Sequence, residues 1–186
     1  MKKLISIMLV LVLAAGTFAL AGCGNSNNSS SDSGSGSSDA SKKLDKAKVS
    51  KFGAYLYYDP DEFTYDEEQL ELFSKDDQQY LYGEVYDETQ IERENKQFDE
   101  RAKKTNLSDV KYGEMDLDNY HAKTVTYKSS GGYSKEYFIV FEQKVGEWAV
   151  AAKVFAMIGD DLSNEAKVDA VAKTFEVNPE RKTEDQ

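Results

Sequence analysis

The sequence predicts an α+β domain built from an antiparallel β-sheet and two covering helices. Short runs rich in Tyr, Phe and Val alternate with polar residues, turn-forming residues separate these runs, and two longer segments have helical periodicity. The expected order of elements is β-β-β-α-β-β-β-β-α. The chain also has 12 Tyr, 9 Phe and 1 Trp, which favours a packed core over a disordered acidic chain.

Three strands and a helix are expected first. The strands are predicted at residues 52–60, 70–74 and 80–86. Thr89 and Glu92 match a T-x-x-E capping box, so a helix is expected to begin there and to end in the segment 105–109. The apolar face of this helix is expected to hold Ile91, Phe98 and Ala102.

Four strands and a second helix are expected next. The strands are predicted at residues 111–117, 120–127, 133–142 and 147–156. Apolar residues occupy both faces of 133–142, which is typical of a central strand covered on both sides. Ser163 is expected to cap the last helix. Its apolar face is predicted to hold Val168, Val171, Ala172 and Phe175.

This order resembles the PsbP-like family of small α/β/α sandwiches over about residues 48–178. The shared features are the turn YDPDEF (58–63), a helix in mid-chain, a meander of strands and a closing helix that ends in AKTFEV (172–177). The resemblance rests on element order. It implies a binding or assembly domain and implies no site residues.

The amino terminus has the layout of a secretory signal. Lys2 and Lys3 precede residues 4–20, which carry no charge. A transmembrane helix is the competing interpretation, but it needs about 20 apolar residues and this run has 17.

The next residues, Leu20, Ala21, Gly22 and Cys23, resemble the lipobox of bacterial lipoproteins. The resemblance implies that a diacylglycerol is attached to the thiol of Cys23 and that the chain is cut before it, after which the new amino terminus can be acylated too. The implied location is the extracytoplasmic face of the cell membrane. Cys23 is the only cysteine, so no intrachain disulfide can form.

A flexible tether is expected after Cys23. Residues 24–41 contain nine Ser, three Gly and three Asn, which cannot bury enough surface to offset their ordering entropy. The expected organisation is a lipoprotein signal peptide (1–22), the lipidated cysteine and tether (23–47), the folded domain (48–178) and a frayed tail (179–186).

The charge of the chain argues against nucleic acid as a partner. Its formal net charge is −11, and beyond residue 22 there are 21 Lys and Arg against 34 Asp and Glu, a net charge of −13. Such a surface repels nucleic acid and anionic lipid. Membrane attachment would therefore come from the acyl chains on Cys23 alone.

No catalytic or metal-binding motif is recognisable, and neither a cofactor nor a metal is expected. His121 is the only histidine, so a zinc site lacks ligands. Acidic clusters lie at 59–62, 116–119 and 159–165, but none matches an EF-hand loop, and each also suits a turn or a helix start. Weak calcium binding stays an open alternative.

Tyrosines form the candidate binding face. Strand alternation places Tyr55 and Tyr57 on one face, and Tyr80, Tyr82 and Tyr86 on one face of another strand. Their rings would line a groove for a sugar or a peptide. In the alternative interpretation, the same rings cover the sheet beneath a helix.

The sequence therefore predicts a membrane-anchored extracytoplasmic lipoprotein whose domain is not an enzyme. It would bind an envelope protein or a small ligand. Two alternatives remain open. One is a hydrolase that acts through carboxylates such as Asp59, Glu62 or Asp118. The other is a structural subunit of an envelope complex.

Overall fold

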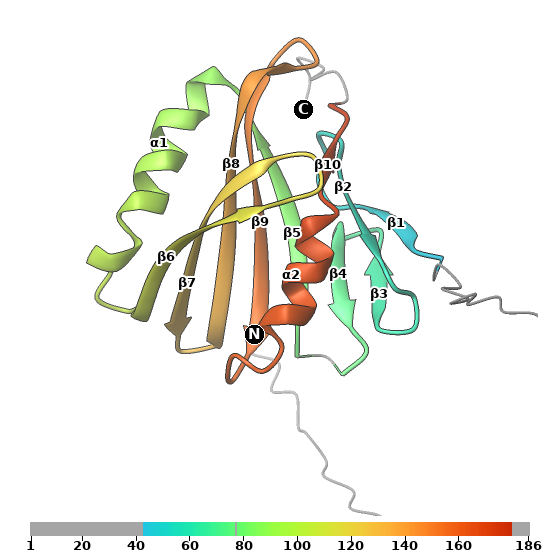
Figure 1. Cartoon of the computed structure of the whole chain (residues 1–186), viewed down its shortest axis with the longest axis vertical. Coiled ribbons are helices and arrows are strands. Elements are labelled where there is room, and N and C mark those ends of the chain that lie inside the picture. The colour runs from blue at the N-terminus through green and yellow to red at the C-terminus, as the bar shows by residue number, and fades with distance from the viewer. Residues whose placement is uncertain (1–42, 77, 180–186) are drawn as a thin grey trace, which may run out of the picture. The chain divides into compact units, whose positions relative to one another are not determined.

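Antiparallel strands and two α-helices make up the part of the chain that the computed structural model describes, residues 43–76 and 78–179 (Figure 1). The α+β class expected from the sequence is confirmed. The expected signal peptide, the lipobox with Cys23, residues 24–42 of the tether and residues 180–186 lie outside the described residues. Within the described ranges, no helix is long and apolar enough to cross a membrane.

The larger sheet has seven antiparallel strands in the order β3-β4-β5-β9-β8-β7-β6. These strands are β3 (Phe63–Asp66), β4 (Glu71–Ser74), β5 (Tyr80–Tyr86), β6 (Ser108–Asp116), β7 (His121–Ser129), β8 (Gly132–Val145) and β9 (Ala149–Gly159). The long strands β5, β9 and β8 lie side by side in the sheet, so their alternating side chains form two broad faces.

A smaller sheet joins the two ends of the domain. It consists of β1 (Asp45–Lys48), β2 (Ala54–Tyr58) and β10 (Glu176–Val177), in the order β1-β2-β10. The loop between β1 and β2 reaches the larger sheet, because the Gly83 amide donates to the Val49 carbonyl at 2.9 Å. This contact positions the loop along β5.

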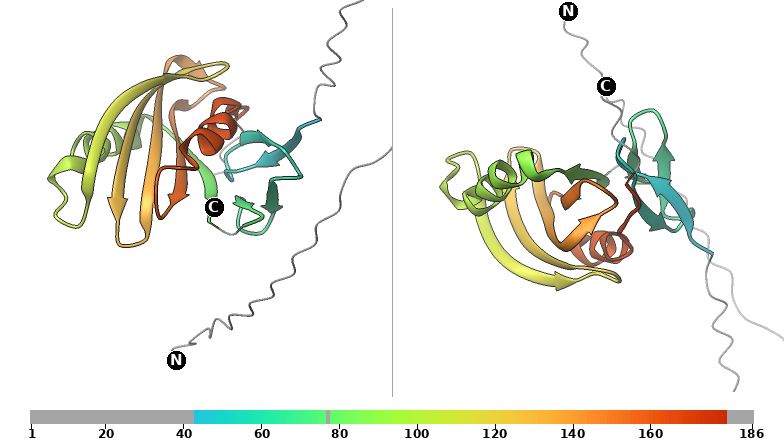
Figure 2. Two further views of the ribbon diagram at one scale, coloured as in Figure 1. Left: turned by 60° about the horizontal axis from the view of Figure 1, so that its bottom comes forward. Right: turned by 90° about the horizontal axis from the view of Figure 1, so that it is seen from above.

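The helices cover opposite faces of the larger sheet, as Figure 2 shows. Phe98 of α1 (Glu88–Asp99) packs on Phe138 of β8, whereas the buried residues of α2 (Glu165–Lys173) share a core with Tyr137. Tyr137 and Phe138 are consecutive in a strand, so they point to opposite faces. A short 3-10 helix, η1 (Arg101–Lys103), follows α1.

Three strands were not expected from the sequence: β1, β3 and β10. β1 begins at Asp45, inside the segment assigned to the tether, and β10 has two residues. Both pair with β2, β1 across a short loop and β10 from the far end of the chain, and strands of two to four residues leave little local pattern. The expected element order is therefore incomplete.

The expected helix caps were also wrong. The capping box at the start of α1 uses Asp87 and Gln90 instead of Thr89 and Glu92, because the Asp87 carboxylate accepts hydrogen bonds from Thr89. The residue that precedes α2 is Asn164, not Ser163, and it makes no side-chain cap. α1 ends at Asp99, which leaves Ala102 exposed instead of on its apolar face.

The predicted core of the second half is confirmed. The buried residues on and after α2 include Val168, Val171, Ala172 and Phe175. In β8, Tyr137, Phe138 and Ile139 are each at most 1% exposed, so this stretch is covered on both faces. The next residue of β8, Val140, is no longer covered and is 52% exposed.

Candidate functional site

A cleft of about 310 Å³ lies beside the second half of β5. Four segments line it: the loop between β1 and β2, the turn between β3 and β4 together with the first residue of β4, β5 itself, and the first turn of α1. The lining residues used below are Lys51, Glu71, Tyr82, Glu84, Tyr86 and Gln90. Its volume is at the lower end of the range for small-molecule sites.

The cleft exists because β4 is too short to pair with all of β5. The last residue pair between them is Leu72 with Leu81, and beyond it the loop containing Val49 lies against β5. Gly83 permits this approach, since a Cβ there would lie 3.0 Å from Cγ2 of Val49.

The turn that closes the cleft has a rare backbone conformation. Leu70 has φ of 58°, in the left-handed region that branched residues seldom adopt. Such a position costs about 1–3 kcal/mol and persists only where the surroundings impose it. Leu70 lies between Gln69 and Glu71, and all three residues line the cleft.

An aromatic strip adjoins the cleft on the same face of the larger sheet. We define it as Phe73, Tyr80, Tyr82 and Phe155, all partly exposed. Register pairs Phe73 with Tyr80 and Tyr82 with Phe155. The ring centroids of Tyr82 and Phe155 are 5.1 Å apart, and those of Tyr80 and Phe155 are 5.6 Å apart. Tyr82 belongs to both the strip and the cleft.

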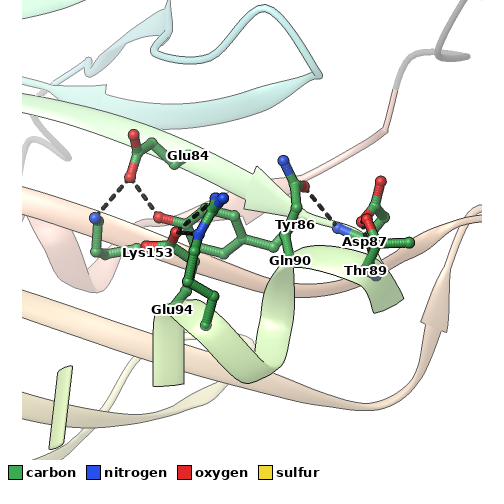
Figure 3. Close-up of polar contacts among 8 residues, drawn as sticks. Glu84, Tyr86, Asp87, Thr89, Gln90, Glu94 and Lys153 are labelled. Atoms are coloured by element: carbon green, nitrogen blue, oxygen red, sulfur yellow. Dashed lines mark hydrogen bonds and ion pairs between the residues drawn. The ribbon is translucent and has the colours of Figure 1, made fainter. Parts of the chain in front are cut away.

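An ion pair orients Glu84, which lines the cleft (Figure 3). Lys153 Nζ lies 2.7 Å from Oε2 of Glu84, and the same oxygen accepts a hydrogen bond from the Tyr86 hydroxyl. Burial acts to raise the pKa of Glu84, but the hydrogen bond and charge of Lys153 hold that pKa below its usual value. Burial raises the pKa of Tyr86 and of Tyr82 far above the usual range.

The start of α1 supplies the polar wall. The Asp87 side chain accepts from the Thr89 amide at 2.9 Å, and Gln90 Oε1 accepts from the Asp87 amide at 3.2 Å (Figure 3). These bonds satisfy amides that the first turn leaves without partners. They also hold Gln90 at the edge of the cleft.

Glu71 differs from the other charged groups of the cleft. It is partly buried, and its side chain makes no hydrogen bond or ion pair with the residues that the structure describes. Burial, and then the charge of Asp66, raise its pKa. Glu71 and Glu84 therefore line one cleft with pKa values shifted in opposite directions.

The five predicted tyrosines do not form one face. Tyr80 and Tyr82 lie in the aromatic strip, whereas Tyr86 is 5% exposed and packs in the cluster that contains Phe98. Tyr55 and Tyr57 belong to the smaller sheet, where Lys46 Nζ lies 4.3 Å from the centroid of the Tyr55 ring. The predicted groove thus reduces to the part built on β5.

The carboxylates considered for catalysis lie elsewhere. Asp59 and Glu62 line a second pocket of about 570 Å³ beside α2. Oδ1 of Asp118 lies 3.9 Å from Nζ of Lys173. His121 is exposed, with Nδ1 2.7 Å from Oδ1 of Asp116. In residues 43–76 and 78–179, no three His, Cys, Asp or Glu side chains are grouped so that they could hold a metal ion.

Sequence reasoning missed most of this site. Glu84 follows Tyr80 and Tyr82 at the strand period, so alternation alone could have placed it on their face. Phe73, Phe155 and Lys153 reach the same face only through pairing with other strands, which the sequence does not reveal. No family model, curated protein or solved structure matched this chain.

Proposed function

We propose that the chain is a membrane-anchored extracytoplasmic lipoprotein whose domain binds a ligand in the cleft beside β5 and does not catalyse a reaction. The observation that supports binding most directly is the aromatic strip, which is partly exposed and continuous with the cleft through Tyr82. Stacked aromatic rings beside a few polar groups are typical of ligand sites.

The anchor is a proposal based on the lipobox at residues 20–23. Replacing Cys23 with Ser is expected either to release the protein into the aqueous phase or to leave an uncut precursor of larger size. The matched control is Ser26→Ala, which should partition and migrate like the unsubstituted protein. Unchanged partitioning and size of Cys23→Ser would refute lipid attachment at this residue.

The PsbP-like architecture also remains a proposal. An antiparallel sheet with one helix on each face is the arrangement that such a sandwich requires, which supports the assignment. The assignment concerns architecture only and adds no site or partner.

Ligand mapping by NMR tests the binding function. Sugars, amines, organic acids and short peptides would be added at millimolar concentration to the folded chain with labelled aromatic side chains. Shifts at Tyr82 and Phe155 are expected for at least one class, and Tyr82→Leu should abolish them. The matched control Tyr57→Leu changes a tyrosine of the smaller sheet and should leave the response intact. Absence of shifts at the strip with every class would refute the function.

A second candidate function is a hydrolase that uses Glu71 and Glu84. Two carboxylates in one cleft whose environments shift their pKa values apart are the arrangement of a general acid and its partner base. The engagement of Glu84 with Lys153 and Tyr86 counts against a free catalytic role. Turnover of a bound glycoside or ester that disappears in both Glu71→Gln and Glu84→Gln would establish the hydrolase and refute the non-catalytic assignment.

A further inference from the structure

Tyrosine, carboxylate and cation form a recurring group in this domain. In five places among the described residues, a tyrosine hydroxyl donates to a carboxylate while a Lys or Arg lies within 6 Å of the ring centroid. The groups are Tyr57 with Glu176 and Lys46, Tyr86 with Glu84 and Lys153, Tyr127 with Glu136 and Arg101, Tyr133 with Asp109 and Lys128, and Tyr137 with Asp169 and Lys135.

The group has a simple electrostatic origin. A carboxylate that is partly removed from water is costly unless a cation accompanies it. The negative face of a tyrosine ring attracts the same cation, more strongly as water is excluded. A cation placed beside both therefore satisfies the carboxylate and uses the ring as a second contact.

Glu71 and Tyr82 bring a carboxylate and a tyrosine ring into one cleft, but in the described chain no hydrogen bond joins them and no cation accompanies them. Glu71 directly precedes Leu72, which pairs with Leu81, and Tyr82 directly follows Leu81, so both residues lie where the β4–β5 pairing ends and both line the cleft. Burial raises the pKa of Tyr80 and of Tyr82 most, and the negative charge of Glu71 adds a smaller effect in the same direction at both. Strand order places Glu71 and Phe155 on opposite sides of Tyr82, so Phe155 does not cover the Glu71 side of that ring.

No cation of the described chain takes the third position. Lys51 lines the cleft, but it is exposed and makes no ion pair with Glu71 or any other described residue. Lys153, the other nearby cation, is bound to Glu84.

We propose that the cleft binds an organic cation, an alkyl ammonium or a guanidinium group, between the Glu71 carboxylate and the Tyr82 ring. This inference deepens the proposed binding function and rests on it. The surrounding charges favour this ligand over an anion, because Asp66 and Glu71 belong to the same hairpin and Glu67 and Glu68 lie between them. An uncharged ligand would leave the partly buried carboxylate without a partner.

The two sources of this chemistry are a free amine and a basic side chain of a peptide. Both would present the same charged group to Glu71, while the aromatic strip would contact the hydrocarbon or peptide that carries it. Calorimetry separates them with spermidine as the free amine and Nα-acetyl-lysine methylamide as the peptide mimic. The neutral isostere Nα-acetyl-norleucine methylamide, the anion glutarate and an oligosaccharide of N-acetylglucosamine complete the set of probes.

The expected result is binding of at least one cation and about tenfold weaker binding, or none, of the norleucine isostere. Glu71→Gln keeps the shape of the side chain and should weaken cation binding about tenfold. Lys51→Gln removes a like charge from the rim and should strengthen it. The matched control is Glu62→Gln, which makes the same change of net charge at the second pocket and should leave affinity unchanged.

Equal weakening by Glu71→Gln and Glu62→Gln would overturn the proposal, because it would indicate general attraction to an acidic protein. Binding of the neutral isostere as tightly as the lysine derivative would also overturn it. An oligosaccharide could instead shift the NMR signals of Tyr82 and still bind the Glu71→Gln variant. That result would refute the cationic ligand but not the binding function. If no probe shifts the NMR signals of Tyr82 or Phe155, both the cationic ligand and the binding function are refuted.

Discussion

Lys135 and Glu136 are neighbours in β8, yet their side chains enter opposite faces of the larger sheet and bind different helical segments. Lys135 Nζ lies 2.9 Å from Oε1 of Glu165 and 2.8 Å from Oδ1 of Asp169, both in α2. Glu136 Oε1 lies 2.7 Å from Nη2 of Arg101, which belongs to η1. Lys135 is 8% exposed and Glu136 is 1% exposed, so one strand carries a buried charge into each layer.

Loss of Arg101 is expected to destabilise the domain. Arg101→Met leaves the buried Glu136 carboxylate without its ion pair, which costs about 3–5 kcal/mol when one partner of a buried pair is removed. Urea denaturation measures this difference. Lys103→Met is the control, because the ion pair of Lys103 with Glu100 is exposed and should contribute less than about 1 kcal/mol.

Removing both charges should restore much of that stability. Glu136 Oε2 and Arg101 Nε make no hydrogen bond with the described residues, so the pair leaves buried polar atoms unsatisfied. Arg101→Met combined with Glu136→Met is therefore expected to be more stable than Arg101→Met alone. A double variant as unstable as the single one would show that side-chain shape, and not charge, determines the loss.

The contact of Lys135 with α2 is expected to couple the helix to the sheet. A double-mutant cycle with Lys135→Met and Asp169→Asn should give a coupling free energy of about 1–2 kcal/mol, because the two groups share an ion pair with little exposure. Amide exchange in α2 should accelerate in Lys135→Met. A coupling energy near zero would mean that α2 is held by its apolar face alone.

Sequence patterns predicted the parts of this fold that depend on local periodicity. The spacing of Val168, Val171 and Ala172 was enough to find the buried face of α2, because a helix repeats within a few residues. The presence of Glu71 and Tyr82 in one cleft was not predictable in this way. It depends on the register between β4 and β5 and on the short length of β4, which are properties of tertiary pairing.

The caps show the same limit at a smaller scale. Asp87, Thr89 and Glu92 each suit the start of a helix, and the sequence does not say which residue leaves the preceding strand. Tyr86 is the last residue of β5, so Asp87 is the first residue able to cap. The position of a cap therefore followed from the end of the strand.

Of the two glycines in the turn between β7 and β8, Gly132 should not tolerate a side chain, whereas Gly131 should accept one. Gly132 has φ of 110°, and a Cβ there would lie 2.5 Å from the carbonyl oxygen of Gly159. Gly132→Ala is expected to lower the free energy of unfolding by about 2 kcal/mol or more, through strain and the clash with β9. Thermal or urea denaturation measures the loss.

Gly131→Ala is the matched control in the same turn. A Cβ at Gly131 would first meet Cε of Met157 at 3.7 Å, an ordinary contact with a flexible side chain. Gly131→Ala should change the free energy of unfolding by less than about 0.5 kcal/mol. Equal losses for the two alanine variants would contradict the backbone argument.

The pKa of His121 is expected to lie above its usual value of about 6.5. The hydrogen bond with Asp116 raises this pKa most, desolvation opposes it, and the charges of Asp116 and Glu114 raise it further. A raised pKa in the folded state means that this interaction stabilises the fold fully below pH ~6.5 and is lost as the pH rises through the folded pKa. His121 is exposed, so the effect on stability should be small.

NMR reads this pKa directly, because His121 is the only histidine of the chain. Asp116→Asn should bring the titration midpoint back toward about 6.5, since the amide carries no charge. Glu114→Gln should lower the midpoint less, because Glu114 lies 3.7 Å from Nε2 whereas Asp116 lies 2.7 Å from Nδ1. A midpoint that Asp116→Asn leaves unchanged would show that the two side chains do not interact in solution.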